Sequence, residues 1–184
     1  MKFLRVLVDE IMDVFFPGSC PVCSSPPKMD EGYYACLECL DEVAWVGGST
    51  CKYCGIPMHS VEYQGLVCSN CRKHSYSFNR GKCMFILDDV GKGVIHAIKY
   101  QGARDVLNDM PHWLDRCAGY RDFLKGAHLV PVPLHRRRES KRGFNQSLWI
   151  AHAIKKDLGS VVEVGDFMKR TRNTPTQTRL EKKE

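Results

Sequence analysis

Four Cys-x-x-Cys pairs constrain this chain more than any other feature of its 184 residues. They are Cys20 with Cys23, Cys36 with Cys39, Cys51 with Cys54, and Cys68 with Cys71. Each pair places two thiolates on one tight turn, and two such turns complete a tetrahedral sulfur site for zinc. The regular repeat therefore predicts two small zinc ribbons in tandem over residues 17–75, holding two zinc ions.

The order of the pairs predicts that neighbouring pairs share an ion, although spacing alone leaves interleaved pairing open. Four sulfur ligands leave no position for a catalytic water, so we expect both ions to be structural. The segments between the pairs hold few aliphatic residues, so the metal has to supply the folding energy that a core would otherwise provide. Isolated redox dithiols are the alternative interpretation of these pairs.

Four other residues could be confused with zinc ligands. His59 and His74 lie close to the pairs in sequence, but a complete cysteine set needs no histidine, so both are expected at the surface. Cys83 and Cys117 stand outside the pairs, and we expect them to be small buried apolar side chains.

The first sixteen residues predict a helix that docks on the rest of the protein. Leu4, Leu7, Val8, Ile11 and Phe15 recur at helical spacing, and Pro17-Gly18 ends the pattern. Acidic residues interrupt this stretch before a secretory signal could form, and no apolar run is long enough to span a membrane. We therefore expect a cytoplasmic protein, in which metal binding outranks disulfide formation.

Residues 76–184 predict an α/β domain. Strand-like runs at 83–87, 127–133 and 161–164 alternate with helical patterns around 94–100, 103–117 and 148–158. The run at 127–133 is the best candidate for a buried central strand. Such alternation is typical of a parallel sheet covered by helices.

The stretch from Val130 to Gln146 carries the densest positive charge of the chain. Five cations fall within seven residues, namely Arg136, Arg137, Arg138, Lys141 and Arg142. Prolines before them and a helical pattern after them predict a strand, a cationic turn and a helix N-terminus, a geometry that receives phosphate. A solvated basic loop is the alternative. The net charge of +6 agrees with an anionic partner, either a phosphorylated small molecule or a nucleic acid.

One tempting motif is expected to be a decoy. Ile86 to Gly93, reading ILDDVGKG, resembles the hydrophobic-Asp-Asp signature with which phosphoribosyltransferases hold a ribose. No hydroxyl residue follows the two aspartates, so we interpret the segment as a turn that caps a helix.

Three motifs together resemble the ComF family: HAIKYQG, PVPLHRRRESKRGFNQS and RTRNTPTQTRL, all downstream of the paired cysteines. ComF proteins are bacterial proteins linked to competence and DNA uptake, and they join a double zinc ribbon to a type I phosphoribosyltransferase-like domain. The resemblance covers nearly the whole chain. It implies a Rossmann-like parallel sheet after the ribbons.

The resemblance also implies a binding site for phosphoribosyl pyrophosphate or a related phosphorylated ligand. The PVPLHRRR segment would approach the pyrophosphate, and TPTQTRL would belong to a mobile segment nearby. Phosphate charge would be neutralised and polar groups oriented by Arg137, Arg138, Lys141, Arg142, Asn145 and Gln146. Magnesium would accompany the ligand in the full-length protein.

Family members normally continue beyond the closing EKKE into a further strand and a ribose-phosphate loop. This chain stops there, so the resemblance implies an incomplete sheet and a site that is inactive alone. An alternative function is that of an accessory factor that binds single-stranded DNA and works with DNA-uptake proteins. In that case bases would stack on Tyr53, Tyr63, Tyr76 and Phe78. The alternative is that these aromatic residues form the core of the small ribbon domain.

Overall fold

The structure is a computed structural model that describes residues 19–26, 34–58, 67–74 and 76–174. The helix expected over residues 1–16, His59 and Tyr63 lie outside these residues. The chain divides into two compact units, Met1–Lys125 and Gly126–Glu184. The domain boundaries drawn from the sequence, at 16/17 and 75/76, stay a prediction.

A short helix begins inside the second cysteine pair of each predicted ribbon in the first unit. Helix α2 spans Leu37–Glu42 and begins directly after Cys36, and helix α3 spans Ser69–Lys73 and begins directly after Cys68. The Cys68 Sγ caps α3 by accepting a hydrogen bond from the Cys71 amide at 3.4 Å. Each helix therefore carries the last cysteine of its ribbon, Cys39 or Cys71, in its first turn.

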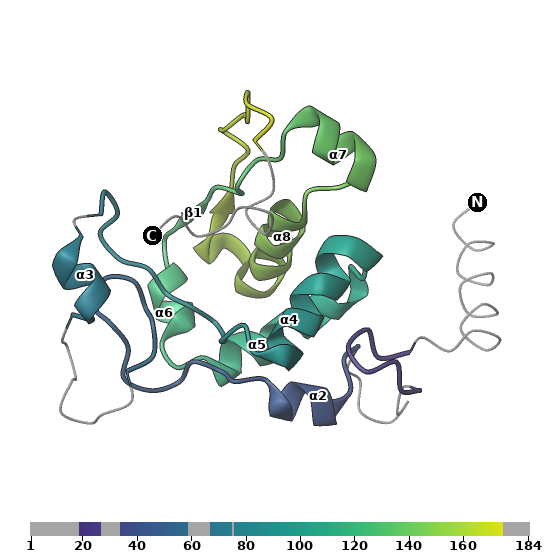
Figure 1. The fold of residues 1–184 in the computed structure, drawn as a ribbon, viewed down its shortest axis with the longest axis horizontal. Coiled ribbons are helices and arrows are strands. Elements are labelled where there is room, and N and C mark those ends of the chain that lie inside the picture. Colours follow the sequence, from purple (N-terminus) through teal and green to yellow (C-terminus); the bar gives the residue numbers. More distant parts are fainter. Residues whose placement is uncertain (1–18, 27–33, 59–66, 75, 175–184) are drawn as a thin grey trace. The chain divides into compact units, whose positions relative to one another are not determined.

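The rest of the first unit is a run of helices (Figure 1). Helix α4 covers Asp89–His96 and continues as a π-helix, η2, over Ala97–Gln101. A 3₁₀-helix, η3, covers Asp105–Asp109, and helices α5 and α6 cover Met110–Arg116 and Tyr120–Leu124. Pro111 lies in the first turn of α5, where its missing N–H costs nothing.

The Asp88-Asp89 motif starts α4 as the sequence predicted. The Gly91 amide donates to Asp88 Oδ1 at 2.7 Å, so Asp88 is the N-cap of the helix. The interpretation of ILDDVGKG as a capping turn is confirmed.

The predicted apolar face of residues 103–117 forms the core of the first unit. All five residues named for it are buried: Val106, Leu107, Met110, Trp113 and Leu114. The strand expected at 83–87 is reduced to one antiparallel bridge between Trp45 and Phe85, flanked by hydrogen bonds from Val46 N to Met84 O and from Ile86 N to Ala44 O, both 2.9 Å. Trp45, Phe85 and Trp113 form an aromatic cluster with ring centroids 5.6–6.4 Å apart.

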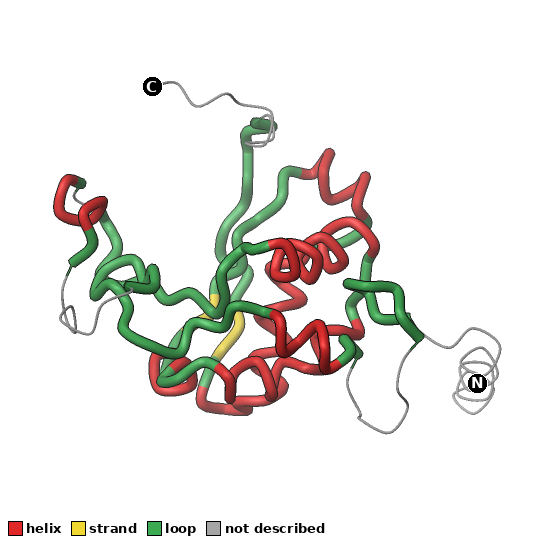
Figure 2. Tube along the Cα trace, turned by 60° about the horizontal axis from the view of Figure 1, so that its bottom comes forward, coloured by secondary structure: helices red, strands yellow, loops and turns green. Residues whose placement is uncertain are grey.

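The second unit contains two parallel strands joined by helices. Strand β1 covers His128–Leu129 and pairs in parallel with β2, Glu163–Val164, with His128 opposite Glu163. Between them lie α7 (Arg136–Arg142), α8 (Gln146–Leu158) and a 3₁₀ turn, η4 (Gly159–Val161). Figure 2 shows the two strands in yellow. The described chain is thus mixed helix with a small two-stranded parallel sheet, and a full Rossmann-like fold is not confirmed.

Two sequence predictions for this unit are wrong. The run at 127–133 is not a buried strand, since β1 covers two residues and Val132 is 63% exposed. Pro131 and Pro133 have no N–H for a central ladder, which limits the strand. The expected cationic turn is instead helix α7, because arginine and lysine favour helix. His135 Nδ1 caps that helix by accepting from the Arg137 amide, and Gly143 ends it at φ 83°.

Candidate metal centres and cationic surface

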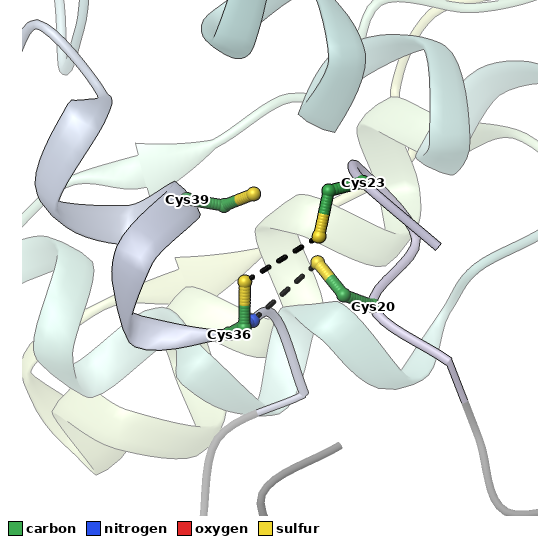
Figure 3. Close-up of side chains that lie close together, drawn as sticks. All are labelled: Cys20, Cys23, Cys36 and Cys39. Atoms are coloured by element: carbon green, nitrogen blue, oxygen red, sulfur yellow. Dashed lines mark hydrogen bonds between the residues drawn. The ribbon is translucent and has the colours of Figure 1, made fainter. Parts of the chain in front are cut away.

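The first four paired cysteines meet at one point. The sulfur atoms of Cys20, Cys23, Cys36 and Cys39 all lie within 4.8 Å of one another (Figure 3). The Cys23 and Cys36 sulfur atoms are 3.6 Å apart. Tetrahedral zinc with Zn–S bonds of about 2.3 Å requires a sulfur–sulfur separation of about 3.8 Å. An all-sulfur set with this spacing therefore fits a structural zinc ion.

Hydrogen bonds and burial act in opposite directions on Cys23 and Cys36 of this set. The Cys36 amide donates to Cys20 Sγ at 3.4 Å. Hydrogen bonds from the Ser25 side chain and backbone lower the pKa of Cys23 to about 6, whereas burial raises the pKa of Cys36 to about 11. The Cys23 thiolate thus forms readily near neutral pH, whereas a metal ion has to displace the proton of Cys36.

The second set repeats this arrangement. The sulfur atoms of Cys51, Cys54, Cys68 and Cys71 lie within 4.8 Å of one another, with Cys54 and Cys68 at 3.7 Å. The Cys68 amide donates to Cys51 Sγ at 3.4 Å. Burial alone would raise the pKa of Cys51, but hydrogen bonds from the Cys68, Cys54 and Tyr53 amides lower it to about 6. The structure groups the pairs sequentially, and the two four-cysteine sites are consistent with two structural zinc ions.

A glycine holds the second site against a later loop. Gly55 has φ 72°, and a Cβ there would lie 2.7 Å from Gly81 O and from Lys82 Cα. Gly81 N in turn donates to Tyr53 O. Only glycine permits this approach, so the turn between Cys51 and Cys54 is fixed to residues 81–83.

The cysteines outside the pairs differ from each other. Cys117 is buried as predicted, and its thiol donates to Met84 O at 3.1 Å. Cys83 is exposed, so the prediction that it is buried is wrong. Its sulfur lies 3.8 Å from Cys54 O, at the loop that Gly55 contacts. His74 is exposed, as expected for a residue that is not a ligand.

The predicted phosphate-binding residues all lie on or next to α7. Arg138 and Arg142 are one helical turn apart, as are Arg137 and Lys141, so each pair shares one side of the helix. Arg142 donates to Gln146 Oε1.

Asn145 caps α8 by accepting from Ser147 N at 3.0 Å, and it donates to Val132 O at 3.1 Å. The described contacts of Asn145 therefore join the loop after β1 to the start of α8. Its role in ligand binding stays a prediction.

Two residues of the RTRNTPTQTRL motif join the predicted phosphate-binding residues: Arg170, which the sequence did not single out, and Thr174, the start of the TPTQTRL segment expected nearby. Arg170 forms a parallel bridge with His135, the cap of α7, and donates to Thr174 Oγ1. Arg138 donates to the backbone oxygen of the same Thr174. The signal was available, since Arg170 follows β2 as His135 follows β1, and the carboxyl ends of parallel strands meet at one edge.

Positive charge is concentrated in this part of the chain. Residues 126–174 contain ten lysine and arginine residues against four aspartate and glutamate residues, a net charge of +6 that equals the net charge of the whole chain. The remaining residues are therefore neutral on balance. Anions should be attracted to the second unit.

Two further sequence predictions concern a magnesium ion and the absence of a membrane-spanning helix. Within the described residues, the two cysteine sets are the groups of metal-binding side chains placed to hold an ion, so the expected magnesium has no support there. No helix in the part of the chain that the structure describes is long and apolar enough to cross a membrane.

The cysteine geometry defines a double zinc ribbon, and the sequence agrees, since residues 11–72 match the family model described as double zinc ribbon domain. The chain is also 26% identical over 127 residues to the competence protein ComFC of Bacillus subtilis (strain 168). The two findings support assignment to the ComF family and confirm the resemblance noted from the motifs.

That similarity covers 65% of this chain and 50% of the Bacillus protein, so the chain spans about half the length of the curated relative that it matches. No solved structure matches the chain.

Proposed function

We propose that this chain serves a competence-related function in DNA uptake and that its second unit binds a phosphorylated ligand such as phosphoribosyl pyrophosphate. The likeness to ComFC supports the biological context. For this chain we propose binding of the phosphorylated ligand and not the transfer of its ribose phosphate.

One observation carries the proposal: guanidinium groups from two distant segments converge on Thr174. Arg138 comes from α7 and Arg170 from the segment after β2, and both donate to that residue. Guanidinium forks match phosphate oxygens, and two of them from different segments make a pocket-like cradle more readily than one helix face does. The net charge of +6 in this unit supports the same proposal.

Isothermal titration of phosphoribosyl pyrophosphate into the two-zinc protein tests it. Wild type should release binding heat, and Arg138→Gln or Arg170→Gln should weaken binding at least tenfold, because each removes a charge-assisted contact. Lys125→Gln, which makes the same charge change in the first unit, is the control and should bind like wild type. Absence of heat with wild type would contradict the proposal.

Exposed aromatic rings on the first unit favour a second candidate function, binding of single-stranded DNA. The rings of Tyr76 and Phe78 stack with centroids 5.0 Å apart and an interplanar angle of 22°, and both side chains are more than 40% exposed. Arg72 and Lys73 lie at the end of the neighbouring helix α3. Stacked rings next to cations suit unpaired bases.

Fluorescence anisotropy with a labelled oligothymidine separates the two candidates. DNA binding through the rings predicts weaker binding for Phe78→Leu and an unchanged affinity for Arg138→Gln. It also predicts loss of affinity between low and moderate salt, because phosphate contacts release counterions. Binding that is insensitive to both salt and Phe78→Leu would contradict this candidate.

A further inference from the structure

The most deeply buried charged side chain described in the first unit belongs to Asp109. It ends η3, directly before α5, and is 1% exposed. Burial raises the pKa of Asp109 above its ordinary value, and hydrogen bonds from the amides of Ala35 and Tyr34 oppose that rise. A buried carboxylate is costly unless hydrogen bonds compensate it, so these contacts have a structural reason.

Those amide partners lie at the first metal site. Tyr34 N donates to the two carboxylate oxygens at 3.0 and 3.2 Å, and Ala35 N donates at 3.0 Å. The next amide, that of Cys36, donates to Cys20 Sγ at 3.4 Å. Three consecutive N–H groups therefore have acceptors. The first two donate to Asp109, and the third, that of Cys36, donates to the sulfur of Cys20 in the same metal site.

The contact between Asp109 and these amides matters for the metal site because the chain runs directly from them into the second cysteine pair. Cys36 is the N-cap of α2, which carries Cys39 on its first turn. Fixing residues 34 and 35 therefore fixes where α2 starts and where both of its sulfur atoms lie. Asp109 thus contacts the two residues that directly precede the second cysteine pair of this site.

The first cysteine pair is held by the same helical region. A Cβ on Gly93 of α4 would lie 2.9 Å from Val22 Cγ1, so the helix packs directly on the turn between Cys20 and Cys23. Both cysteine pairs of the first site are therefore contacted by helices that come much later in the sequence, namely η3 and α4.

The second metal site has no corresponding carboxylate among the described residues. Cys68 N donates to Cys51 Sγ just as Cys36 N donates to Cys20 Sγ. The Val67 amide, which corresponds to that of Ala35, has no carboxylate partner among the described residues, and the counterpart of Tyr34 lies outside them. The second site therefore serves as the comparison for the effect of Asp109.

We propose that Asp109 is a positioning residue for the first zinc site, coupling retention of that ion to the packing of η3 and α5. Loss of its carboxylate releases the Tyr34–Cys36 backbone, and the first zinc ion then dissociates faster while the second does not. Supporting hydrogen bonds around metal ligands commonly change metal affinity 10- to 100-fold.

Zinc transfer to a chromogenic chelator from the intact two-zinc protein tests this inference. Wild type, Asp109→Asn and Asp109→Ala are compared, with Asp105→Asn as the control, since Asp105 is an exposed aspartate of the same η3. Cysteine alkylation followed by peptide mass analysis identifies which site opens. In Asp109→Ala, peptides carrying the first four cysteines should be alkylated at least tenfold faster, with Asp109→Asn intermediate and Asp105→Asn unchanged.

Hydrogen exchange gives an independent reading in Asp109→Asn, which keeps the size of the side chain and decides the question alone if Asp109→Ala does not fold. Amides 34–36 should lose protection while amides 51–56 keep it. Equal acceleration of release at both zinc sites would show that Asp109 supports the fold in general, and no acceleration would show that it does not position the site; either result overturns the inference.

Discussion

At the scale of single residues, the two cysteines outside the pairs are expected to differ in their reactivity toward alkylating reagents. In the zinc-loaded protein, iodoacetamide at pH 8 should modify Cys83, which is exposed. Cys117 should not react, because burial raises its pKa to about 11 and leaves about one thiolate in a thousand at that pH. Reaction of Cys117 should appear after denaturation. Mass analysis of peptides checks this, and equal modification of the two thiols in native protein would contradict their placement.

Two neighbouring aspartates offer a second residue-scale prediction. Asp88→Ala removes the cap of α4 and should lower the free energy of unfolding by about 1 kcal/mol. Asp89→Ala removes a contact of 3.1 Å to Lys92 between exposed side chains and should change stability little. Urea denaturation of the zinc-loaded proteins measures both. If Asp89→Ala is the more harmful change, the assignment of Asp88 as the cap is wrong.

The sequence predicted the role of a residue correctly where that role depends on close sequence neighbours. The capping role of Asp88 and the buried face around Trp113 follow from neighbours within a helical turn, and the sequence was sufficient for them. Cys83, by contrast, lies in a loop whose backbone at 81–83 approaches Gly55, almost thirty residues earlier. Contacts of that kind leave no periodic signal in a sequence.

At the scale of elements, the grouping of the cysteine pairs gives a direct prediction. Sequential grouping means that a protein with Cys20→Ser and Cys36→Ser loses one site and keeps one zinc ion, because both ligands belong to the same set. With Cys20→Ser and Cys51→Ser, both sites are damaged and zinc content should fall below one ion.

Native mass spectrometry counts the ions, with wild type expected to carry two. Interleaved grouping predicts a different pattern, in which the first double variant damages both sites. A measured value of zero ions for that variant with an intact fold would contradict the arrangement described here.

Among the elements, helices were easier to predict than strands. Helix α8 ends at Gly159 as its apolar pattern indicated. The expected strand at 127–133 shrank to two residues, because prolines interrupt it and β2 pairs with only two of its residues. The cationic turn became α7 because the same arginines that suit phosphate also suit a helix. Charge alone could not distinguish these two conformations.

At the scale of the whole molecule, the cysteine metal sites and the net positive charge belong to different units. Both four-cysteine sites lie in the first compact unit, whereas residues 126–174 carry the net charge of +6. The sequence predicted the zinc ribbons because ligand spacing is a local property. It located the cationic segment because most of its cations are consecutive, but it did not predict that this segment forms helix α7. It did not single out Arg170, although the position of this residue after the second parallel strand, like that of His135 after the first, was a usable signal.

Removal of zinc should therefore affect the two units differently. Treatment with a strong chelator should unfold the ribbon region, whose folding energy comes from the metal. The second unit has its own buried residues, including Ala151, Ile154 and Val162, and should keep its helices. Hydrogen exchange before and after chelation measures this, with residues 146–158 expected to stay protected; loss of protection there as fast as at 36–42 would contradict independence of the two units.

The most direct test of the central claim is a hydrogen-exchange map of the two-zinc protein with and without phosphoribosyl pyrophosphate. Binding by the cations of the second unit predicts added protection confined to 130–146 and 167–174, with zinc content unchanged. No added protection, or protection confined to residues 67–80 of the first unit, would contradict it.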